Sequence, residues 1–199
     1  MKILFLGYPD SPLIPFMREK GDAVFEVSPD EKIETASVLD GRFDFLVSYG
    51  YLHILKGDLL SLFPQRAINL HIAYLPWNRG KDPNFWSFIE GTPKGVTIHA
   101  LDTGIDTGDI LFQREIFFDS TETLKTSYEK LRKGMEKLFF KNWEEIRKGN
   151  CPRKKQAQTG SFHLARDKEP LLHLLTQSWD TPVATLVDFG RANNRFIRG

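Results

Sequence analysis

Residues 68–111 read INLHIAYLPWNRGKDPNFWSFIEGTPKGVTIHALDTGIDTGDIL. Apolar and polar residues alternate at the start of this stretch, so Asn69 and His71 point to the same face if this is the end of a strand. Further along, Asp106 lies in a segment with two glycines, a composition that favours a tight loop over a helix. A carboxylate on such a loop can orient an imidazole or move a proton. We therefore predict that Asn69, His71 and Asp106 form one polar site.

The rest of the chain alternates predicted strands with predicted helices. A continuous apolar run that ends at glycine predicts a buried first strand over residues 2–7. Further strands are predicted over residues 23–27, 43–49, 67–71, 96–101 and 110–118. Helices are predicted over residues 57–63, 83–90, 120–148, 169–177 and 182–192, with a short one after the loop 8–12. This order predicts an α/β fold with a doubly wound, mostly parallel, Rossmann-like sheet.

The character of the sequence changes near residue 150. The helix predicted before this point is long and amphipathic, although it contains Gly134, which costs about 1 kcal/mol relative to alanine. Residues 152–160 are polar and are expected to cross the surface, and two shorter helical segments follow. We expect a main domain over residues 1–150 and a small C-terminal helical appendage over residues 151–199, packed on the same domain.

Composition limits the classes of partner. The chain has 199 residues and is 41% hydrophobic, which is enough to form a buried core. Its net charge of +1 provides no broad positive surface for nucleic acid or an anionic membrane. The single cysteine, Cys151, excludes an intrachain disulfide and fits a reducing cytoplasm. We expect a cytoplasmic protein without nucleic-acid or membrane partners. The long helix and the aromatic tail leave a homodimer open.

Several motifs occur together in one order. They are Asn69-x-His71, Leu75-Pro76, Arg79-Gly80 with Pro83, Gly95-Val96-Thr97-x-His99 and Asp106-Thr107-Gly108. Together they resemble the signature of the formyltransferases that use N10-formyltetrahydrofolate. The resemblance is strong over residues 45–117. It implies that residues 1–150 are the catalytic domain. Residues 160–163 and 179–183 are similar, more loosely, to the sugar N-formyltransferases.

The resemblance assigns catalytic roles to Asn69, His71 and Asp106. Formyl transfer between amines passes through a tetrahedral adduct with a developing oxyanion, so the Asn69 amide is expected to donate to that oxygen, alone or with the imidazole. His71, held by Asp106, is expected to move the proton. The reaction needs no metal, and none is expected. Without the family, His71 is more typical of a structural histidine, and Asn69 and Asp106 are more typical of turn residues.

The resemblance also implies where the folate donor binds. The residues expected to contact it are Tyr49, Gly50, Tyr51, Leu52, His53, Leu55, Asp102, Thr103 and Gly104. In the family the backbone of the first segment hydrogen-bonds the flat pterin, and Gly50 would allow the chain to approach the ring closely. His53 stands where the purine-biosynthetic members carry an arginine, so the contact of that arginine is not expected here. Alternatively, residues 51–55 form a buried turn into the next helix.

The expected acceptor is a small amine, most simply a nucleotide-linked amino-deoxy sugar. Its contacts are predicted at Tyr8, Trp77, Arg79, Lys81 and His99. Trp77 can pack on the face of a sugar or a base, and the cations of Arg79 and Lys81 can bind a diphosphate. An exposed loop with solvated charges is the alternative for residues 77–81, and a core position is an equal alternative for His99.

Other members of the family remain as alternatives. Glycinamide ribonucleotide transformylase would bring a glycine- and serine-rich phosphate loop after the first strand, whereas Pro9 here removes a donor and Asp10 repels an anion. Methionyl-tRNA formyltransferase would carry a further C-terminal domain and a more basic surface, and formyltetrahydrofolate hydrolase an N-terminal regulatory domain. A non-catalytic module that binds folate or a nucleotide sugar, and a generic nucleotide-binding α/β domain, are also left open.

Overall fold

The computed structural model describes residues 1–157 and 159–196, which form two compact units. Unit 1 comprises Met1–His71, Ile98–Phe112 and Glu136–Gln156. Unit 2 comprises Ile72–Thr97, Gln113–Met135 and Ala157–Gly199. Each unit is thus assembled from segments that are far apart in the sequence. The boundary predicted at residue 150 falls inside the last segment of unit 1 and stays a prediction.

A six-stranded sheet with the order β2-β1-β3-β4-β6-β7 confirms the predicted α/β fold. Its strands are β1 (Lys2–Gly7), β2 (Ala23–Val27), β3 (Phe45–Tyr49), β4 (Ala67–His71), β6 (Gly95–Ala100) and β7 (Ile110–Glu115). β1 pairs in parallel with β2 and β3, and β3 pairs in parallel with β4. Because the chain moves outward from β1 in both directions, the sheet is doubly wound, and polar residues after its strands gather at one edge.

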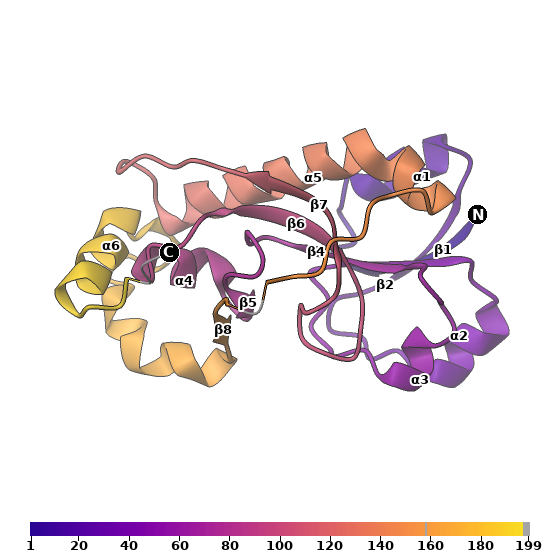
Figure 1. Cartoon of the computed structure of the whole chain (residues 1–199), viewed down its shortest axis with the longest axis horizontal. Helices are drawn as coiled ribbons and strands as arrows, with labels where there is room; N and C mark the ends of the chain where they lie inside the picture. The colour runs from indigo at the N-terminus through magenta and orange to yellow at the C-terminus, as the bar shows by residue number, and fades with distance from the viewer. Residues whose placement is uncertain (158, 197–199) are drawn as a thin grey trace. The chain divides into compact units, whose positions relative to one another are not determined.

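Helices of unit 1 cover the sheet because its strands are apolar on both faces. The helices α2 (Thr35–Gly41) and α3 (Gly57–Leu60) place Val38 and Leu59 against Leu4, Leu6 and Leu46. Figure 1 shows these two helices on one side of β1, with α1 (Leu13–Glu19) on the other. On that second side Phe45 meets Trp143, with ring centroids 5.6 Å apart. A parallel sheet covered in this way requires the continuous apolar runs that the sequence shows.

Unit 2 is built around α4 (Pro83–Ile89). The elements beside it are β5 (Arg79–Gly80), β8 (Phe162–His163), the 3-10 helices η1 (Ala165–Leu174) and η2 (Ser178–Asp180), and α6 (Val183–Ala192). The core residues of this unit are Phe85, Trp86, Phe88, Ile89, Leu124, Leu171, Leu174, Val183 and Leu186. At Gly190 of α6 a Cβ atom would lie 2.0 Å from the carbonyl oxygen of Ile89, so only glycine permits this approach of α6 to α4.

The helix α5 (Leu124–Lys148) has 25 residues and begins four residues later than predicted. The preceding residues form a turn, in which the Asp119 carboxylate accepts the backbone N–H of Thr121 at 3.0 Å. Gly134 inside the helix has a packing role, because a Cβ atom there would lie 2.3 Å from the Cδ1 atom of Ile116. None of the helices in the described part of the chain combines the length and apolarity needed to cross a bilayer.

Candidate active site

The end of β4 and the loop 102–108 bring together Asn69, His71 and Asp106. The Nδ2 atom of Asn69 lies 3.1 Å from Oδ1 of Asp106, and Nδ1 of His71 lies 3.7 Å from Oδ2 of the same carboxylate. The histidine and aspartate side chains are about nine-tenths buried, which limits solvent screening between them. One carboxylate therefore bridges an amide and an imidazole, with the imidazole somewhat beyond hydrogen-bond length. Such bonds are often long before a substrate is bound.

His99 of β6 is the fourth member of this cluster. Its side chain is 1% exposed, and its Nδ1 lies 2.8 Å from the carbonyl oxygen of Ala100. When Nδ1 carries the proton for that bond, Nε2 of the neutral ring is an acceptor. That Nε2 lies 3.2 Å from Nδ2 of Asn69 and 3.4 Å from Oδ1 of Asp106. His99 thus lies in contact with the predicted catalytic residues, and it fixes the orientation of the Asn69 amide.

The contacts of Asn69 bear on its predicted role. Its amide nitrogen carries two hydrogens, and in this structure they are directed at Asp106 and His99. To donate to an oxyanion, Asn69 has to give up one of these bonds. The Nε2 atom of His71 lies on the side of the imidazole ring away from the carboxylate, because Nδ1 faces Asp106.

The loop that carries Asp106 is held in an uncommon conformation. Asp106 has φ of +54°, in the left-handed region that residues other than glycine seldom adopt. Two residues later, a Cβ atom on Gly108 would lie 1.9 Å from the carbonyl oxygen of Ala100. At the start of the loop, the Asp102 carboxylate accepts the N–H of Gly104 at 3.1 Å and the hydroxyl of Thr107 at 2.7 Å. Asp102 therefore braces the loop from within.

Gln156 closes the same loop from outside. Its Nε2 donates to the carbonyl oxygens of Asp106 and Gly108, each at 2.8 Å. Nearby, Lys154 forms an antiparallel bridge with Ile110. The sequence predicted only a polar surface crossing here, because a glutamine that bonds backbone atoms about 50 residues away leaves no local pattern. Gln156 is thus a residue of the site that sequence reasoning missed.

The segment predicted to bind the donor is tied down at two of its residues. The Tyr51 hydroxyl donates to the carbonyl of Glu31 at 2.8 Å and accepts the N–H of Ile33 at 3.0 Å. Burial raises the pKa of Tyr51 above its ordinary value, and the neighbouring glutamates add to that rise. His53 places Nε2 2.8 Å from the carbonyl oxygen of Asp30. These two side chains support the neighbouring loop of the protein.

Two apolar side chains of that segment are exposed. Leu52 is 57% exposed and Ile54 is 73% exposed, whereas Tyr49 is buried and Leu55 packs at the edge of the unit 1 core. Large exposed aliphatic side chains next to each other leave apolar surface for a ligand to cover. Ile54 was not among the predicted contact residues.

Gly50 makes room for a protein ring. It has φ of +77°, and a Cβ atom there would lie 2.3 Å from the ring of Tyr8. The Tyr8 ring also meets Tyr49 edge to face, with centroids 5.2 Å apart. The close approach that we expected between Gly50 and the pterin is made in this structure by Tyr8, a predicted acceptor contact.

Three more of the predicted acceptor residues, Trp77, Arg79 and Lys81, lie in unit 2, within residues 77–81. The N–H of Arg79 donates to the carbonyl of Ser161 at 3.0 Å, and the N–H of Lys81 donates to that of His163 at 2.9 Å. Trp77 and Arg79 are half-buried, and Lys81 is exposed. Nε2 of His163 lies 2.9 Å from Oε1 of Glu90. The backbone of this loop is therefore fixed, and its two cations belong to a half-buried arginine and an exposed lysine.

No group of three or more metal-ligating side chains is found among residues 1–157 and 159–196. The lone cysteine is also unsuited to nucleophilic chemistry, because burial raises the pKa of the Cys151 thiol and disfavours the reactive thiolate.

Comparisons with known proteins identify the family of this chain. Residues 15–142 match the protein family described as formyl transferase. A dTDP-4-amino-4,6-dideoxyglucose formyltransferase of Mycobacterium tuberculosis H37Rv is 35% identical over 133 residues, which cover 67% of this chain and 56% of that protein. A methionyl-tRNA formyltransferase of Thermodesulfovibrio yellowstonii is 34% identical over 141 residues, covering 70% of this chain and 44% of that one. The chain spans about half the length of these curated relatives.

One solved structure is similar over nearly the whole chain. It is the formyltransferase PseJ from Anoxybacillus kamchatkensis in complex with UDP-4,6-dideoxy-4-formamido-L-AltNAc and tetrahydrofolate. The identity is 46%, the TM-score is 0.91, and the match covers 96% of this chain and 100% of that one. This chain therefore belongs to the formyl transferase family.

Proposed function

We propose that this protein transfers the formyl group of N10-formyltetrahydrofolate to the primary amine of a nucleotide-linked amino-deoxy sugar. The observation that carries the proposal is the cluster at the end of β4, where the Asp106 carboxylate lies between the amide of Asn69 and the imidazole of His71. Two similar proteins support the class of acceptor, because the name of one and the bound ligand of the other specify a nucleotide-linked sugar with an amino or formamido group.

The donor is proposed to bind across unit 1 beside the segment 49–55. Its flat pterin would cover the exposed side chains of Leu52 and Ile54, which removes apolar surface from water. The braced loop that starts at Asp102 would present backbone groups to the same molecule, together with Thr103 and Gly104. Because the bonds within the loop fix its shape, little ordering is required when the donor binds.

The reaction makes one C–N bond and breaks another. The acceptor nitrogen attacks the formyl carbon, and the carbonyl oxygen becomes an oxyanion in the tetrahedral adduct. Collapse of the adduct breaks the bond to N10, and the proton lost by the acceptor amine ends on the folate nitrogen. His71 is proposed to carry this proton, with Asp106 holding the ring by its Nδ1 edge. General acid–base catalysis of this kind contributes about 10²- to 10⁴-fold to a rate.

The oxyanion needs a donor that points away from the carboxylate. His71 can supply one from Nε2 when the ring carries both protons, because its Nδ1–H then faces Asp106. Asn69 joins as a second donor if its bond to His99 or Asp106 opens as the adduct forms. A single donor of this type is worth about 10²- to 10³-fold in kcat.

The proposal is tested by incubating the protein with N10-formyltetrahydrofolate and a panel of acceptors. The panel contains UDP- and dTDP-linked amino-deoxy sugars, glycinamide ribonucleotide and methionyl-tRNA. We expect release of tetrahydrofolate and formation of a formamide with at least one nucleotide-linked sugar, and with neither of the other acceptors. Turnover with glycinamide ribonucleotide or methionyl-tRNA alone would contradict the proposed acceptor class. Binding of folate without turnover on the whole panel would favour a non-catalytic module.

A further inference from the structure

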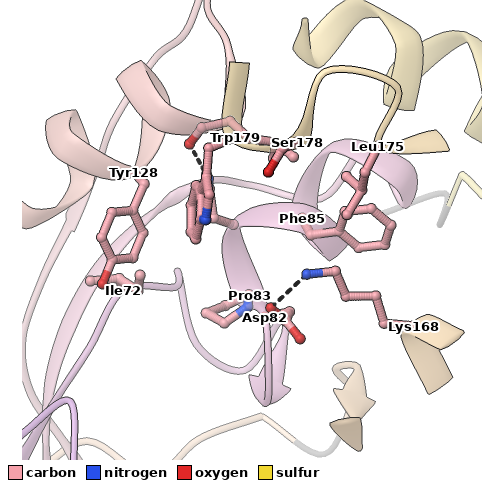
Figure 2. Close-up of a pocket in the computed structure, with 11 residues that line it drawn as sticks. Ile72, Asp82, Pro83, Phe85, Tyr128, Lys168, Leu175, Ser178 and Trp179 are labelled. Atoms are coloured by element: carbon pink, nitrogen blue, oxygen red, sulfur yellow. Dashed lines mark hydrogen bonds and ion pairs between the residues drawn. The ribbon is translucent and has the colours of Figure 1, made fainter. Parts of the chain in front are cut away.

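Unit 2 contains a pocket of about 530 Å³ between the start of α4, the first turns of α5, and the 3-10 helices η1 and η2. Figure 2 shows the indole of Trp179 beside the Tyr128 ring, and the ion pair of Asp82 with Lys168, whose charged atoms are 2.9 Å apart. The residues that line the pocket all belong to unit 2. The surroundings of His71 are therefore described from unit 1 itself.

In unit 1, two glycines seat the ring of Tyr8. Gly50 has φ of +77°, and a Cβ atom there would lie 2.3 Å from the Cε2 and Cζ atoms of the ring and 2.7 Å from its hydroxyl oxygen. Gly7 has φ of +141°, and a Cβ atom there would lie 1.8 Å from the carbonyl oxygen of Tyr49. Glycine adopts both conformations readily, and other residues seldom do. The sequence Gly7-Tyr8 and the glycine at position 50 thus fix the place of one aromatic ring.

The backbone of Tyr8 is fixed as well. Its N–H donates to the carbonyl of Tyr49 at 3.2 Å, and its carbonyl accepts the N–H of Ser11 at 3.1 Å. The Tyr8 ring meets Tyr49 edge to face, with centroids 5.2 Å apart. Tyr49 is 1% exposed, whereas Tyr8 is half-buried. Part of Tyr8 is therefore accessible to another molecule, while its position is set by the protein.

The strand register relates Tyr8 to the catalytic strand. Leu6 of β1 is in register with Ser48 of β3, and Ser48 is in register with Asn69 of β4. These three residues form one line across three parallel strands. Residues in such a line have side chains on the same face of the sheet, and every second residue along each strand returns to that face.

Two residues beyond this line the chain passes through Tyr8, Gly50 and His71, where the three strands end. Neighbouring strands lie about 4.8 Å apart. Gly50 is the middle member and has no side chain, and the Tyr8 ring occupies the space that a side chain there would take. The ring thus extends from β1 toward β4, and it lies one strand spacing, about 5 Å, from the chain at His71.

This position favours contact with the acceptor over contact with the donor. Because the Tyr8 ring takes the space at Gly50, the flat ring of the donor is left with the exposed Leu52 and Ile54 farther along the segment. The attacking amine has to come within about 3–3.5 Å of the formyl carbon beside His71. The ring carbons of the acceptor sugar are attached to that amine, so they come close to the groups around His71. A deoxy sugar presents C–H groups where hydroxyls are missing, and an aromatic side chain can pack against them.

We propose that Tyr8 is a specificity-determining residue that forms one wall of the acceptor site in unit 1. Its ring packs against the sugar ring that carries the reacting amine. Because the ring is seated on Gly50, it limits which positions of the amine can reach the formyl carbon. This inference rests on the proposed function, because it takes an amino-deoxy sugar as the acceptor. Tyr8, Gly50 and His71 all belong to unit 1.

The test compares two nucleotide-linked sugars, namely the amino sugar that the wild type prefers and the isomer that carries the amine on the neighbouring ring carbon. The measured quantity is the ratio of their kcat/KM values with N10-formyltetrahydrofolate. Tyr8→Ala should lower this ratio by about tenfold or more, because the vacated wall admits the wrong isomer. Tyr8→Phe keeps the ring and should keep the ratio within about twofold.

Two controls separate this role from a structural one. Affinity for 5-formyltetrahydrofolate, measured by calorimetry, should change less than about twofold in Tyr8→Ala, because the donor contacts other residues. Phe25→Ala removes an aromatic side chain of β2, 45% exposed, and should leave the ratio unchanged. Thermal unfolding checks that each variant is folded.

A second variant tests the seat of the ring. Gly50→Ala places a Cβ atom where the Tyr8 ring lies, so it should displace the ring and lower the same ratio. Because both changes act on one contact, the double variant Gly50→Ala with Tyr8→Ala should show no further loss beyond that of Tyr8→Ala. Additive losses would overturn the role of Gly50 as the seat of the ring.

The outcomes separate this inference from the proposed function. If an amino sugar is formylated and the ratio is the same in the wild type and in Tyr8→Ala, the assignment of Tyr8 is overturned and the proposed function stands. A loss of 5-formyltetrahydrofolate affinity as large as the loss in the ratio would assign Tyr8 to the donor and also overturn it. If the wild type formylates no amino sugar, the proposed function fails, and the assignment of Tyr8 fails with it.

Discussion

The side-chain amide of Asn69 donates to Oδ1 of Asp106 across 3.1 Å, and the same nitrogen lies 3.2 Å from Nε2 of His99. Three segments of unit 1 are thereby joined at one point, namely the end of β4, the end of β6 and the loop 102–108. The second carboxylate oxygen of Asp106 is left facing Nδ1 of His71. In the resting site the amide therefore organises the acid, and the acid orients the imidazole.

His71→Ala is the most direct test of the proton-transfer role. We expect kcat to fall by about 10²- to 10⁴-fold, because the variant lacks the imidazole that is proposed to accept and deliver the proton. Affinity for 5-formyltetrahydrofolate, an unreactive donor analogue, should change less than twofold, or about 0.4 kcal/mol. Steady-state kinetics and calorimetry measure the two effects. Retention of wild-type kcat would remove His71 from the mechanism.

Asn69→Asp introduces a pH dependence with a defined sign. Two carboxyl groups about 3 Å apart do not both ionise readily, so the pKa of one of them should rise. Below this raised pKa the shared proton replaces the amide hydrogen between the two groups, and part of the activity should survive. Above it the two carboxylates repel each other, so activity should be lost as pH increases.

The matched control for this prediction is Asn69→Ala, which has no group to hold the proton. Its activity should be low throughout and should not recover in acid. The pH profiles of kcat/KM for the two variants are compared with that of the wild type. Parallel profiles for Asn69→Asp and Asn69→Ala would show that the contact between Asn69 and Asp106 does not govern activity.

Gln156→Ala should loosen the loop that carries Asp106. It removes two hydrogen bonds to backbone carbonyls, with a combined net effect of about 1–3 kcal/mol. Amide hydrogen exchange over residues 104–108 should accelerate, and kcat should fall. Lys155→Ala is the neighbouring control, because it removes a 3.2 Å ion pair with Asp109 whose lysine side chain is 91% exposed. Equal protection of the loop in both variants would contradict the bracing role of Gln156.

Lys94 should make stability depend on pH in the alkaline range. Burial lowers its pKa from 10.5 to about 8, even though Nζ donates to the carbonyl of Thr92 at 3.0 Å. Between these two values the unfolded chain binds more protons than the folded chain, so the free energy of unfolding rises with pH across that interval. The total rise attributable to Lys94 is up to about 3 kcal/mol.

Lys94→Met should remove this dependence and stabilise the protein at neutral pH. Denaturant unfolding at pH 7, 8, 9 and 10 measures how the free energy of unfolding of each protein changes with pH. Lys125→Met, which replaces an exposed lysine, is the control and should keep the wild-type slope. An unchanged slope in Lys94→Met would show that Lys94 is not the titrating group.

Asp22→Ala should destabilise unit 1. The buried carboxylate accepts from Nε1 of Trp143 at 3.2 Å and from Nη2 of Arg147 at 2.7 Å, and it forms a 2.9 Å ion pair with the N-terminal ammonium group. Its loss removes all three contacts. We expect a loss of about 3 kcal/mol, which lowers Tm by about 6–12 °C for a chain of this size. Glu26→Ala breaks the more exposed 2.7 Å pair with Arg18 and should cost about 0–1 kcal/mol. Similar Tm values for the two variants, measured by calorimetry, would contradict the importance of the Asp22 contacts.

The strands and the polar cluster could be predicted because their signals are local. Continuous apolar runs define β1 and β3, and alternation across Asn69 and His71 places both side chains on one face of β4. The glycines around Asp106 indicated a loop, and the structure has one. In each case neighbouring residues are sufficient to set the local conformation.

The elements that prediction missed depend on tertiary contacts. The helix α2 buries only Val38, so its sequence has no apolar periodicity to detect. The helix predicted over residues 169–177 is instead the 3-10 helix η1, and Pro170 within it removes a backbone donor that an α-helix would use. The contacts of Gln156 and the pocket beside Trp179 join residues distant in sequence, so they leave no pattern along the chain.

The contacts of Asp22 also bear on how the chain folds during synthesis. Its partners Trp143 and Arg147 follow it by 121 and 125 residues, so they leave the ribosome long after β1 and β2. Until then the carboxylate has the N-terminal ammonium group of Met1 as a partner, at 2.9 Å, and the side that Trp143 and Arg147 later cover has to remain hydrated. The first strands are therefore expected to stay open on that side while translation continues, and emergence of the last turns of α5 would allow that side to close.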